Sequence, residues 1–326
     1  MGAGSWGSAF SLVLADAGND VRLWGRRADL CETLTTKHEN PEYLPGITLP
    51  DTVVAHPEPA EALGDADVVV LAVPSQTLRD NLEAWAPLLG PDMVLLSLMK
   101  GVELHSAMRM SEVIAEVTGA GPERIGVVSG PNLAREIAER QPAASVVACA
   151  DGTVATRLQQ LCHTATFRPY TNIDVVGCEL GGATKNVIAL AVGMASGLGF
   201  GDNTTASVIT RGLVETGRLA AAAGADPLTL SGLAGLGDLV ATCSSPLSRN
   251  RTFGERLGRG TTIDEVVAST RQVAEGVKSC EPLRELAVRH EVEMPIVEHV
   301  SAVVRGEKTP EQMLKSLISR AARSER

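Results

Sequence analysis

The glycine-rich segment at residues 2–7, GAGSWG, follows the pattern G-x-G-x-x-G. A helical pattern continues from it to about Ala17, and a β-branched run begins at Asp20. In a strand–turn–helix unit, Gly2 would permit the tight turn, Gly4 would let the backbone approach a pyrophosphate, and Gly7 would allow close helix packing. The helix N-terminus attracts the anion. The spacing therefore predicts a dinucleotide-binding βαβ unit, and a glycine-rich turn without a ligand is the alternative.

A loop of this kind normally follows a buried first strand, whereas only Met1 precedes Gly2. That strand lies at the centre of the sheet, so its absence would remove ladder hydrogen bonds and expose the neighbouring strands. We therefore expect the native N-terminus to extend upstream of Met1, and we expect the chain as given to bind its cofactor poorly.

The end of the second strand distinguishes NAD from NADP, because an acidic residue there binds the ribose 2′-hydroxyl of NAD. This sequence has Gly25, Arg26 and Arg27 instead. Guanidinium groups can pair with a 2′-phosphate, which predicts that NADP is at least tolerated. The alternative is a solvated basic turn.

The pattern of the chain changes near residue 172. Before it, β-branched runs alternate with helical patterns, which is typical of βαβ units. The predicted strands are 20–24, 52–55, 67–73, 93–98, 125–129, 145–150 and 165–170. Beyond it the predicted elements are all helices: 175–196, 204–223, 229–236, 263–270, 281–289 and 295–305. The predicted fold class is α/β, with a Rossmann-type parallel-sheet domain at 1–172 and an all-α domain at 173–326. A chain of 326 residues suits two domains.

Composition excludes several classes of partner. A net charge of -10 would repel a nucleic-acid backbone. Six scattered cysteines, without a C-x-x-C pair or a signal peptide, indicate reduced thiols in the cytoplasm and no metal site. The longest apolar stretch, 187–200, is shorter than the roughly 20 residues that span a bilayer, so we expect no stable membrane insertion.

A proton donor is the next requirement, because hydride transfer to a carbonyl leaves a developing alkoxide. Lys185 and Asn186 interrupt a helical segment of otherwise small or apolar residues, and Gly181 and Gly182 leave an open face beside them. Lys185 is therefore the candidate acid and base. A lysine that merely extends its ammonium to water is the alternative.

Other polar residues stand where ligands could bind. Lys100 follows the predicted strand 93–98, at an edge where α/β sheets bind ligands. The turn at 129–132 could present backbone amides to an anion. Arg249 with Asn250 could clamp a phosphate, and Asp238 could orient a lysine. Each of these segments could equally be an ordinary turn or helix cap.

At these segments the chain resembles the bacterial NAD(P)-dependent glycerol-3-phosphate dehydrogenases. The similar stretches occur in family order and cover nearly the whole chain. They are GAGSWG (2–7), YLPGI (43–47), VPSQ (73–76), KGVE (100–103), SGPNLAREIA (129–138), CELGGATKNVIALAVG (178–193), GLGFGDNTTASVITRG (197–212), GLAGLGDLVATC (232–243) and SRN (248–250). The resemblance implies reversible reduction of dihydroxyacetone phosphate to sn-glycerol 3-phosphate with NAD(P)H, for phospholipid biosynthesis, by a homodimer.

The resemblance also implies residue roles. Lys185 would be the general acid and base, supported by Lys100, Asn186, Asp238 and Thr242. The substrate would contact Lys100, Gly130, Asn132, Lys185, Asp238, Ser248, Asn250 and Arg249, the last on its phosphate. The cofactor would contact Gly2, Gly4, Ser5, Trp6, Gly7, Arg26, Arg27, Lys100, Ala134, Arg249, Val273 and Glu275. The rival hypotheses are a dehydrogenase acting on a hydroxy acid or a sugar-acid phosphate, and a dinucleotide-sensing protein without turnover.

Overall fold

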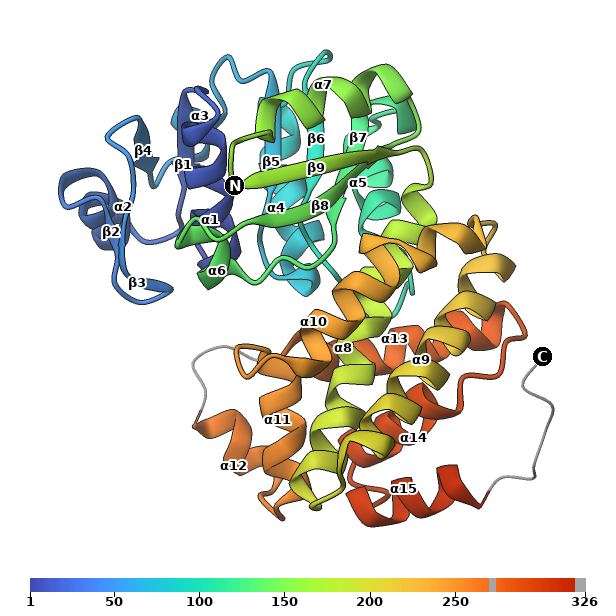
Figure 1. The fold of residues 1–326 in the computed structure, drawn as a ribbon. Helices are drawn as coiled ribbons and strands as arrows, with labels where there is room; N and C mark the ends of the chain where they lie inside the picture. The colour runs from blue at the N-terminus through green and yellow to red at the C-terminus, as the bar shows by residue number, and fades with distance from the viewer. Residues whose placement is uncertain (270–273, 320–326) are drawn as a thin grey trace.

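The chain folds into an α/β domain followed by an all-helical domain, as Figure 1 shows. The structure is a computed structural model that describes residues 1–269 and 274–319. The predicted fold class is confirmed. Val273, a predicted cofactor residue, lies outside the described residues.

The larger sheet holds five strands in chain order. They are β5 (Val68–Leu71), β6 (Val94–Ser97), β7 (Ile125–Ser129), β8 (Ala143–Cys149) and β9 (Phe167–Asn172). Neighbouring strands are parallel except β7 and β8, which are antiparallel. The short helix α6 (Ala134–Ala138) is the only helix between those two, and a parallel return needs a longer crossover.

A second parallel pair, β1 (Val21–Trp24) with β4 (Val53–His56), lies beside the larger sheet. All seven predicted strands are therefore present, with boundaries shifted by a few residues. The short antiparallel pair β2 (Glu39–Asn40) and β3 (Leu44–Thr48) is an element that the sequence did not predict.

Between β1 and β5, Met1 and Gly2 continue the sheet. The amine of Met1 donates to the carbonyl of Val70 at 2.7 Å, and the Met1 carbonyl accepts from Ala72 at 2.9 Å. Gly2 donates to the carbonyl of Trp24 at 3.0 Å. A cavity of about 720 Å³ lies alongside, between the two sheets.

Helices cover both faces of the larger sheet. Aromatic contacts tie α1 (Ser5–Asp16) to it, since Phe10 meets the ring of Phe167 edge to face. On the other face α4 (Leu78–Trp85) and α5 (Met110–Thr118) bury Trp85 with Val69 and Leu95. The remaining helices of this domain are α2 (Ala28–Thr36), α3 (Pro59–Leu63) and α7 (Gly152–Cys162).

The helical domain is built around α8 (Val175–Gly197), which is buried from Gly177 to Ala195. Its neighbours are α9 (Asp202–Ala222), α10 (Asp238–Ser244), α11 (Arg249–Gly258), α13 (Glu275–Arg289) and α14 (Pro295–Val304), with α12 (Ile263–Ala268) and α15 (Pro310–Ile318) further out. The helix predicted at 229–236 is instead a 3₁₀ turn (Pro227–Ser231) and a π turn (Leu233–Gly237). Helices α10, α11 and α15 were not predicted.

Glycines let α8 and α11 touch along their backbones. A Cβ at Gly193 would overlap the carbonyl oxygen of Arg251, and one at Gly254 would overlap that of Leu190. By length and composition α8 could cross a membrane, yet 89% of its apolar window is buried inside the protein. The helix therefore serves as the core of this domain.

Candidate active site

The glycine-rich loop has the geometry that a pyrophosphate requires. Gly2 has φ +121°, and a Cβ on Gly7 would overlap the carbonyl oxygen of Gly2. Gly4 has no atom within 4 Å of the position that its Cβ would take, and no side chain caps α1. The first N–H groups of α1 are therefore available to an anion. These residues fit a dinucleotide.

The other predicted cofactor residues surround this loop. Ser5 donates to the carbonyl of Tyr43 at 2.7 Å. Trp6 packs in one apolar cluster with Ala134, and its indole N–H is buried without a partner among the described residues. Arg26 is exposed beyond β1, while Arg27 forms an ion pair with Glu42 at 2.6 Å. Both arginines are exposed, and the guanidinium group of Arg27 is already bound by Glu42.

Two lysines from different domains meet on one carboxylate. Lys100 follows β6, Lys185 lies on α8, and Asp238 is the first residue of α10. Lys100 Nζ donates to Asp238 Oδ2 at 2.7 Å and to the carbonyl of Gly130 at 2.7 Å. Lys185 Nζ donates to Asp238 Oδ1 at 2.5 Å and to Thr242 Oγ1 at 2.7 Å. Asp238 therefore fixes both ammonium groups side by side.

A chain of amides extends this centre toward α13. Asn186 donates to the carbonyl of Lys100 at 3.0 Å, and Asn250 donates to Asn186 Oδ1 at 2.8 Å. The backbone N–H of Gly276 donates to Asn250 Oδ1 at 2.9 Å. The side chain of Asn186 thereby links the lysine of one domain to α11 and α13 of the other.

Burial sets the electrostatics of the site. Desolvation lowers the pKa of Lys100 to about 8, helped by the charge of Lys185 and opposed by Asp238. Desolvation also raises the pKa of Glu275, against the pull of Arg249 and the two lysines. Glu275 and Arg249 therefore lie within electrostatic reach of the lysine centre. An ammonium with a pKa near neutrality can lose or gain a proton at modest cost.

Asn132 follows β7, and both atoms of its side-chain amide are buried without a partner among the described residues. Since buried polar groups are nearly always hydrogen-bonded, such an orphaned amide is the kind of group that a ligand satisfies. Ser248 instead caps α11, where its hydroxyl accepts from the N–H of Arg251 at 3.2 Å. It places the exposed Arg249 at the first turn of that helix.

The sequence did not predict the buried ion pair between Glu179 and Arg109. Glu179, on α8, accepts from Arg109 Nη1 at 2.6 Å, from the Ser111 hydroxyl at 2.6 Å and from the Ser111 N–H at 2.8 Å. Arg109 precedes α5 directly, and Ser111 lies in the first turn of that helix. Glu179 therefore joins the first turns of α8 to the α/β domain. Its signal was the same as that of Lys185, an ionisable residue in an apolar helix.

Comparison with known proteins shows which family the chain belongs to. Two family models match: NAD-dependent glycerol-3-phosphate dehydrogenase N-terminus at residues 1–155, and the C-terminus of the same family at residues 174–315. The chain belongs to this family. The family predicted from the sequence is therefore confirmed, and this family implies NAD(P)H as the cofactor.

Relatives of this dehydrogenase family align over almost the whole chain. A protein of Streptomyces griseus named glycerol-3-phosphate dehydrogenase (NAD(P)+) is 66% identical over all of this chain and 97% of its own length. One of Thermobifida fusca with the same name is 62% identical over all of this chain and 97% of its own length. The crystal structure of glycerol-3-phosphate dehydrogenase from Coxiella burnetii has a TM-score of 0.93 at 36% identity, covering 98% of this chain and 97% of that one.

Proposed function

We propose that this chain is an NAD(P)-dependent glycerol-3-phosphate dehydrogenase that reversibly reduces dihydroxyacetone phosphate to sn-glycerol 3-phosphate. The observation that carries the proposal is the pair of ammonium groups held by Asp238 within a chain of the family just described. A neutral carbonyl and a phosphate both suit a centre so rich in donors.

Lys185 is the proposed acid and base. When bound, the dihydronicotinamide supplies the hydride that becomes the hydrogen on C2 of the triose. Lys185 Nζ donates a proton to the oxygen on C2 as the carbonyl becomes a hydroxyl, and it accepts that proton in the reverse direction. Asp238 and Thr242 hold Nζ in place at 2.5 and 2.7 Å. Asn186 links this lysine to its neighbour Lys100.

The substrate's phosphate is assigned to Arg249, with Asn250 and Ser248 beside it, because a guanidinium binds phosphate through two parallel donors. Gly130, Asn132 and Lys100 are assigned to the rest of the substrate. The cofactor residues are Gly2, Gly4, Gly7, Ser5, Trp6, Arg26, Arg27, Ala134 and Glu275, with Lys100 and Arg249 shared between the two ligands. The orphaned amide of Asn132 and indole of Trp6 support these assignments.

Initial rates with NADPH test the reaction. We expect oxidation with dihydroxyacetone phosphate and none with 2-keto acids or sugar-acid phosphates. Lys185→Ala should lower kcat by a factor of about 100 or more while cofactor binding is retained, because general acid catalysis contributes on this scale. Lys37→Ala, an exposed lysine on the far edge of the α/β domain, is the control. Turnover of another keto compound alone, or an unaffected Lys185→Ala variant, contradicts the proposal.

Cofactor preference is tested by comparing NADH and NADPH after neutralising Arg26, and then Arg27. Arg26→Gln should raise KM for NADPH more than Arg27→Gln, since Glu42 already pairs with Arg27. KM for NADH should stay the same in both variants. Equal effects on the two cofactors would remove these residues from the 2′-phosphate role.

The setting of this activity is proposed on the family resemblance. We place the enzyme in the cytoplasm as a homodimer that supplies phospholipid biosynthesis, without stable membrane insertion or a nucleic-acid partner. We also place the domain boundary between residues 172 and 173, in the turn that joins β9 to α8. Light scattering of the purified protein tests the dimer, because a monomer mass of 34.1 kDa would exclude it.

A further inference from the structure

Two side chains of α8 hold the two ends of one loop of the α/β domain. Asn186 donates to the carbonyl of Lys100 at 3.0 Å. Glu179 accepts from Arg109 Nη1 and from the Ser111 hydroxyl, both at 2.6 Å. Glu179 and Asn186 lie about two helical turns apart, so they project from the same face of α8, roughly 10 Å apart along its axis. The loop is therefore attached to the central helix at two points.

The loop between these points contains a compact hairpin, residues 102–109. Val102 and Arg109 form an antiparallel bridge at its base. Within it the N–H of Glu103 donates to the carbonyl of Met108 at 2.9 Å. Because these bonds join its two arms, the hairpin moves as one piece.

The 102–109 hairpin is fixed to its own domain by two side chains that follow β5. Arg79 forms an ion pair with Glu103 at 2.9 Å. Gln76 donates to the carbonyl of Val102 and accepts from the N–H of Leu104, both at 2.8 Å. The hairpin therefore presents a fixed surface of the α/β domain to α8.

Apolar contacts seat this hairpin on α8. Val102 and Ala107 are fully buried, and both belong to the apolar core of the helical domain. Leu180 and Ala183 of α8 lie in the same core, and in the sequence they stand between the two polar attachment points. A part of the α/β domain is thus packed into the core of the other domain.

The side chain of Lys100 crosses α8 between the two attachment points. A Cβ at Gly182 would lie 3.3 Å from Lys100 Cγ, and Gly182 is about one turn from each attachment point on the same face. Lys100 Nζ then reaches Asp238 at 2.7 Å. The place of α8 against the hairpin therefore decides where this ammonium group meets that of Lys185.

Burial makes the bond at Glu179 selective for one alignment. The residue is 6% exposed. Its burial raises the pKa of the carboxyl, while Arg109 and Ser111 oppose this rise. A buried ion pair adds little net stability, because the loss of hydration offsets the attraction, but it requires its partners to be well aligned. Such a pair suits a role in alignment more than one in stability.

We propose that Glu179 is a positioning residue that holds α8 in register against the 102–109 hairpin. In this register the two lysine ammonium groups meet on Asp238. The bond from Asn186 is one attachment point, and a helix held at one point is free to pivot. Glu179 supplies the second point, which fixes the direction of the helix.

Glu179→Gln tests the proposal, because it keeps the size of the side chain and an oxygen for Ser111 while it removes the charge that binds Arg109. NMR of lysine labelled with ¹³C at Cε follows the titration of Lys100, whose resonance is identified by its loss in Lys100→Arg. The wild type should titrate near pH 8, because burial lowers the pKa of Lys100 to about 8. In Glu179→Gln the midpoint should rise by about 0.5 pH unit or more, since water that enters a loosened junction relieves the desolvation.

The rate supplies a second readout, which rests on the proposed function. With dihydroxyacetone phosphate and NADPH, kcat per folded molecule should fall about tenfold in Glu179→Gln, because a misplacement of about 1 Å is costly on this scale. Arg109→Lys retains the charge but reaches less far, so both effects should be smaller and in the same direction. This variant also carries the test if Glu179→Gln does not fold.

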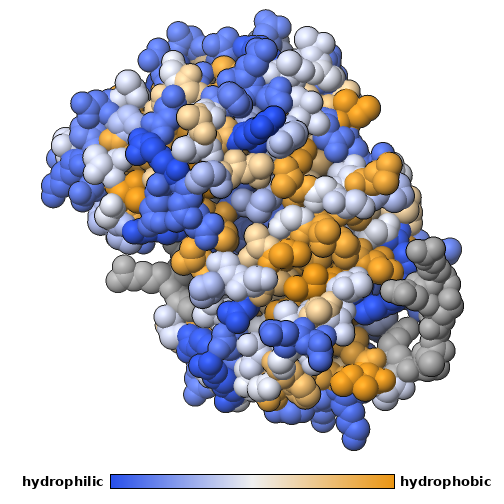
Figure 2. All heavy atoms as spheres, in the orientation of Figure 1, coloured by the Kyte–Doolittle hydropathy of each residue, from blue (hydrophilic) through white to orange (hydrophobic). Residues whose placement is uncertain are grey.

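Met313→Ala on α15 is the matched control for lost stability. Met313 is fully buried, and α15 lies at the end of the helical domain away from the α/β domain, at the bottom of Figures 1 and 2. Truncation of a buried methionine should lower the Tm at least as much as Glu179→Gln does. It should leave the titration of Lys100 and kcat per folded molecule unchanged.

The two readouts separate the possible failures. A folded Glu179→Gln protein in which Lys100 titrates as in the wild type overturns the positioning role, whether or not the wild type reduces dihydroxyacetone phosphate. An equal shift in Met313→Ala assigns the effect to stability and overturns the role as well. Absence of turnover in the wild type, with the expected shift in Glu179→Gln, contradicts the proposed function and supports the positioning role.

Discussion

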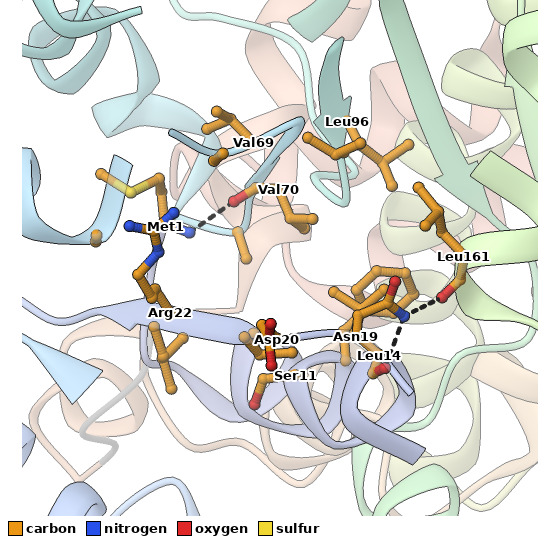
Figure 3. Close-up of a pocket in the computed structure, with 18 of the residues that line it drawn as sticks. Met1, Ser11, Leu14, Asn19, Asp20, Arg22, Val69, Val70, Leu96 and Leu161 are labelled. Atoms are coloured by element: carbon orange, nitrogen blue, oxygen red, sulfur yellow. Dashed lines mark hydrogen bonds between the residues drawn. The ribbon is translucent and has the colours of Figure 1, made fainter. Parts of the chain in front are cut away.

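The central elements of the two domains differ in how closely they are packed. In the helical domain α8 is enclosed from Gly177 to Ala195, and α11 touches it through paired glycines. In the α/β domain a cavity of about 720 Å³ lies between β1 and β5 (Figure 3), beside the point where Met1 and Gly2 bond to the two strands. The proposed proton donor therefore lies on a close-packed helix, whereas Met1 and Gly2, at the start of the proposed cofactor loop, are bound to the neighbouring strands by three main-chain hydrogen bonds.

This difference separates two requirements of one reaction. Proton transfer needs a position accurate to a fraction of an ångström, and a close-packed helix supplies it. Pyrophosphate binding needs the backbone N–H groups of the Gly2–Gly7 loop to be held in position by the strands beside it. The contrast predicts that defects in the helical domain will affect kcat and folding, while changes at the sheet will mainly affect cofactor affinity.

The largest effect should come from filling the contact between α8 and α11. Gly193→Val would place atoms on the carbonyl oxygen of Arg251, and we expect a loss of more than about 4 kcal/mol in the free energy of unfolding, or no folding at all. Gly217→Ala on α9 is the control, because the nearest atom lies 3.9 Å away. The control should gain up to about 1 kcal/mol from its higher helix propensity. Equal denaturation midpoints would refute the close packing.

The next largest effect should come from breaking the buried ion pair between Arg109 and Glu179. Glu179→Ala removes the buried carboxylate partner of Arg109, which keeps only the more exposed Glu112, and we expect a loss of about 3 kcal/mol in the free energy of unfolding in urea. Asp16→Asn, at the exposed pair with Arg140, should cost less than about 1 kcal/mol. Similar losses in both variants would show that burial contributes nothing to the difference.

A titration of stability should reveal the buried amine of Met1. Its pKa is lowered from 8.0 to about 5, so the folded state binds its proton less readily than the unfolded state. The resulting contribution is fully present above pH 8 and is lost as pH falls toward 5, by at most roughly 4 kcal/mol. Acetylation of Met1 should flatten this dependence. An unchanged pH profile after acetylation would place the amine in water.

The helical domain should show the opposite dependence at Glu215, which accepts from the N–H of Ile296 at 3.0 and 2.9 Å. Burial raises its pKa from 4.5 to about 7. Stability is therefore greatest below pH 4.5 and falls as pH rises through 7, by at most roughly 3 kcal/mol. Glu215→Gln should remove this decline while it preserves one acceptor. If the free energies of unfolding of wild type and variant change with pH in the same way across this range, the carboxylate of Glu215 is already ionised in the folded state.

How much the sequence predicts depends on how local the signal is. The strands are present because buried parallel strands read as β-branched runs, and Lys185 stands out as a charge in an apolar helix. Helices α10 and α11 escaped prediction because they lie in Gly- and Ser-rich segments, where packing against α8 decides the conformation. The amide chain from Asn186 through Asn250 to Gly276 was equally unpredictable, since its members lie far apart in the sequence.

Asp238 has a consequence for how a ligand enters. Its two oxygens accept from a lysine of each domain, so the two domains are joined to each other at the proposed catalytic centre. A substrate that arrives need not draw the two halves toward each other. We therefore expect the rate of substrate binding to fall with viscosity far less than it would if a hinge had to close.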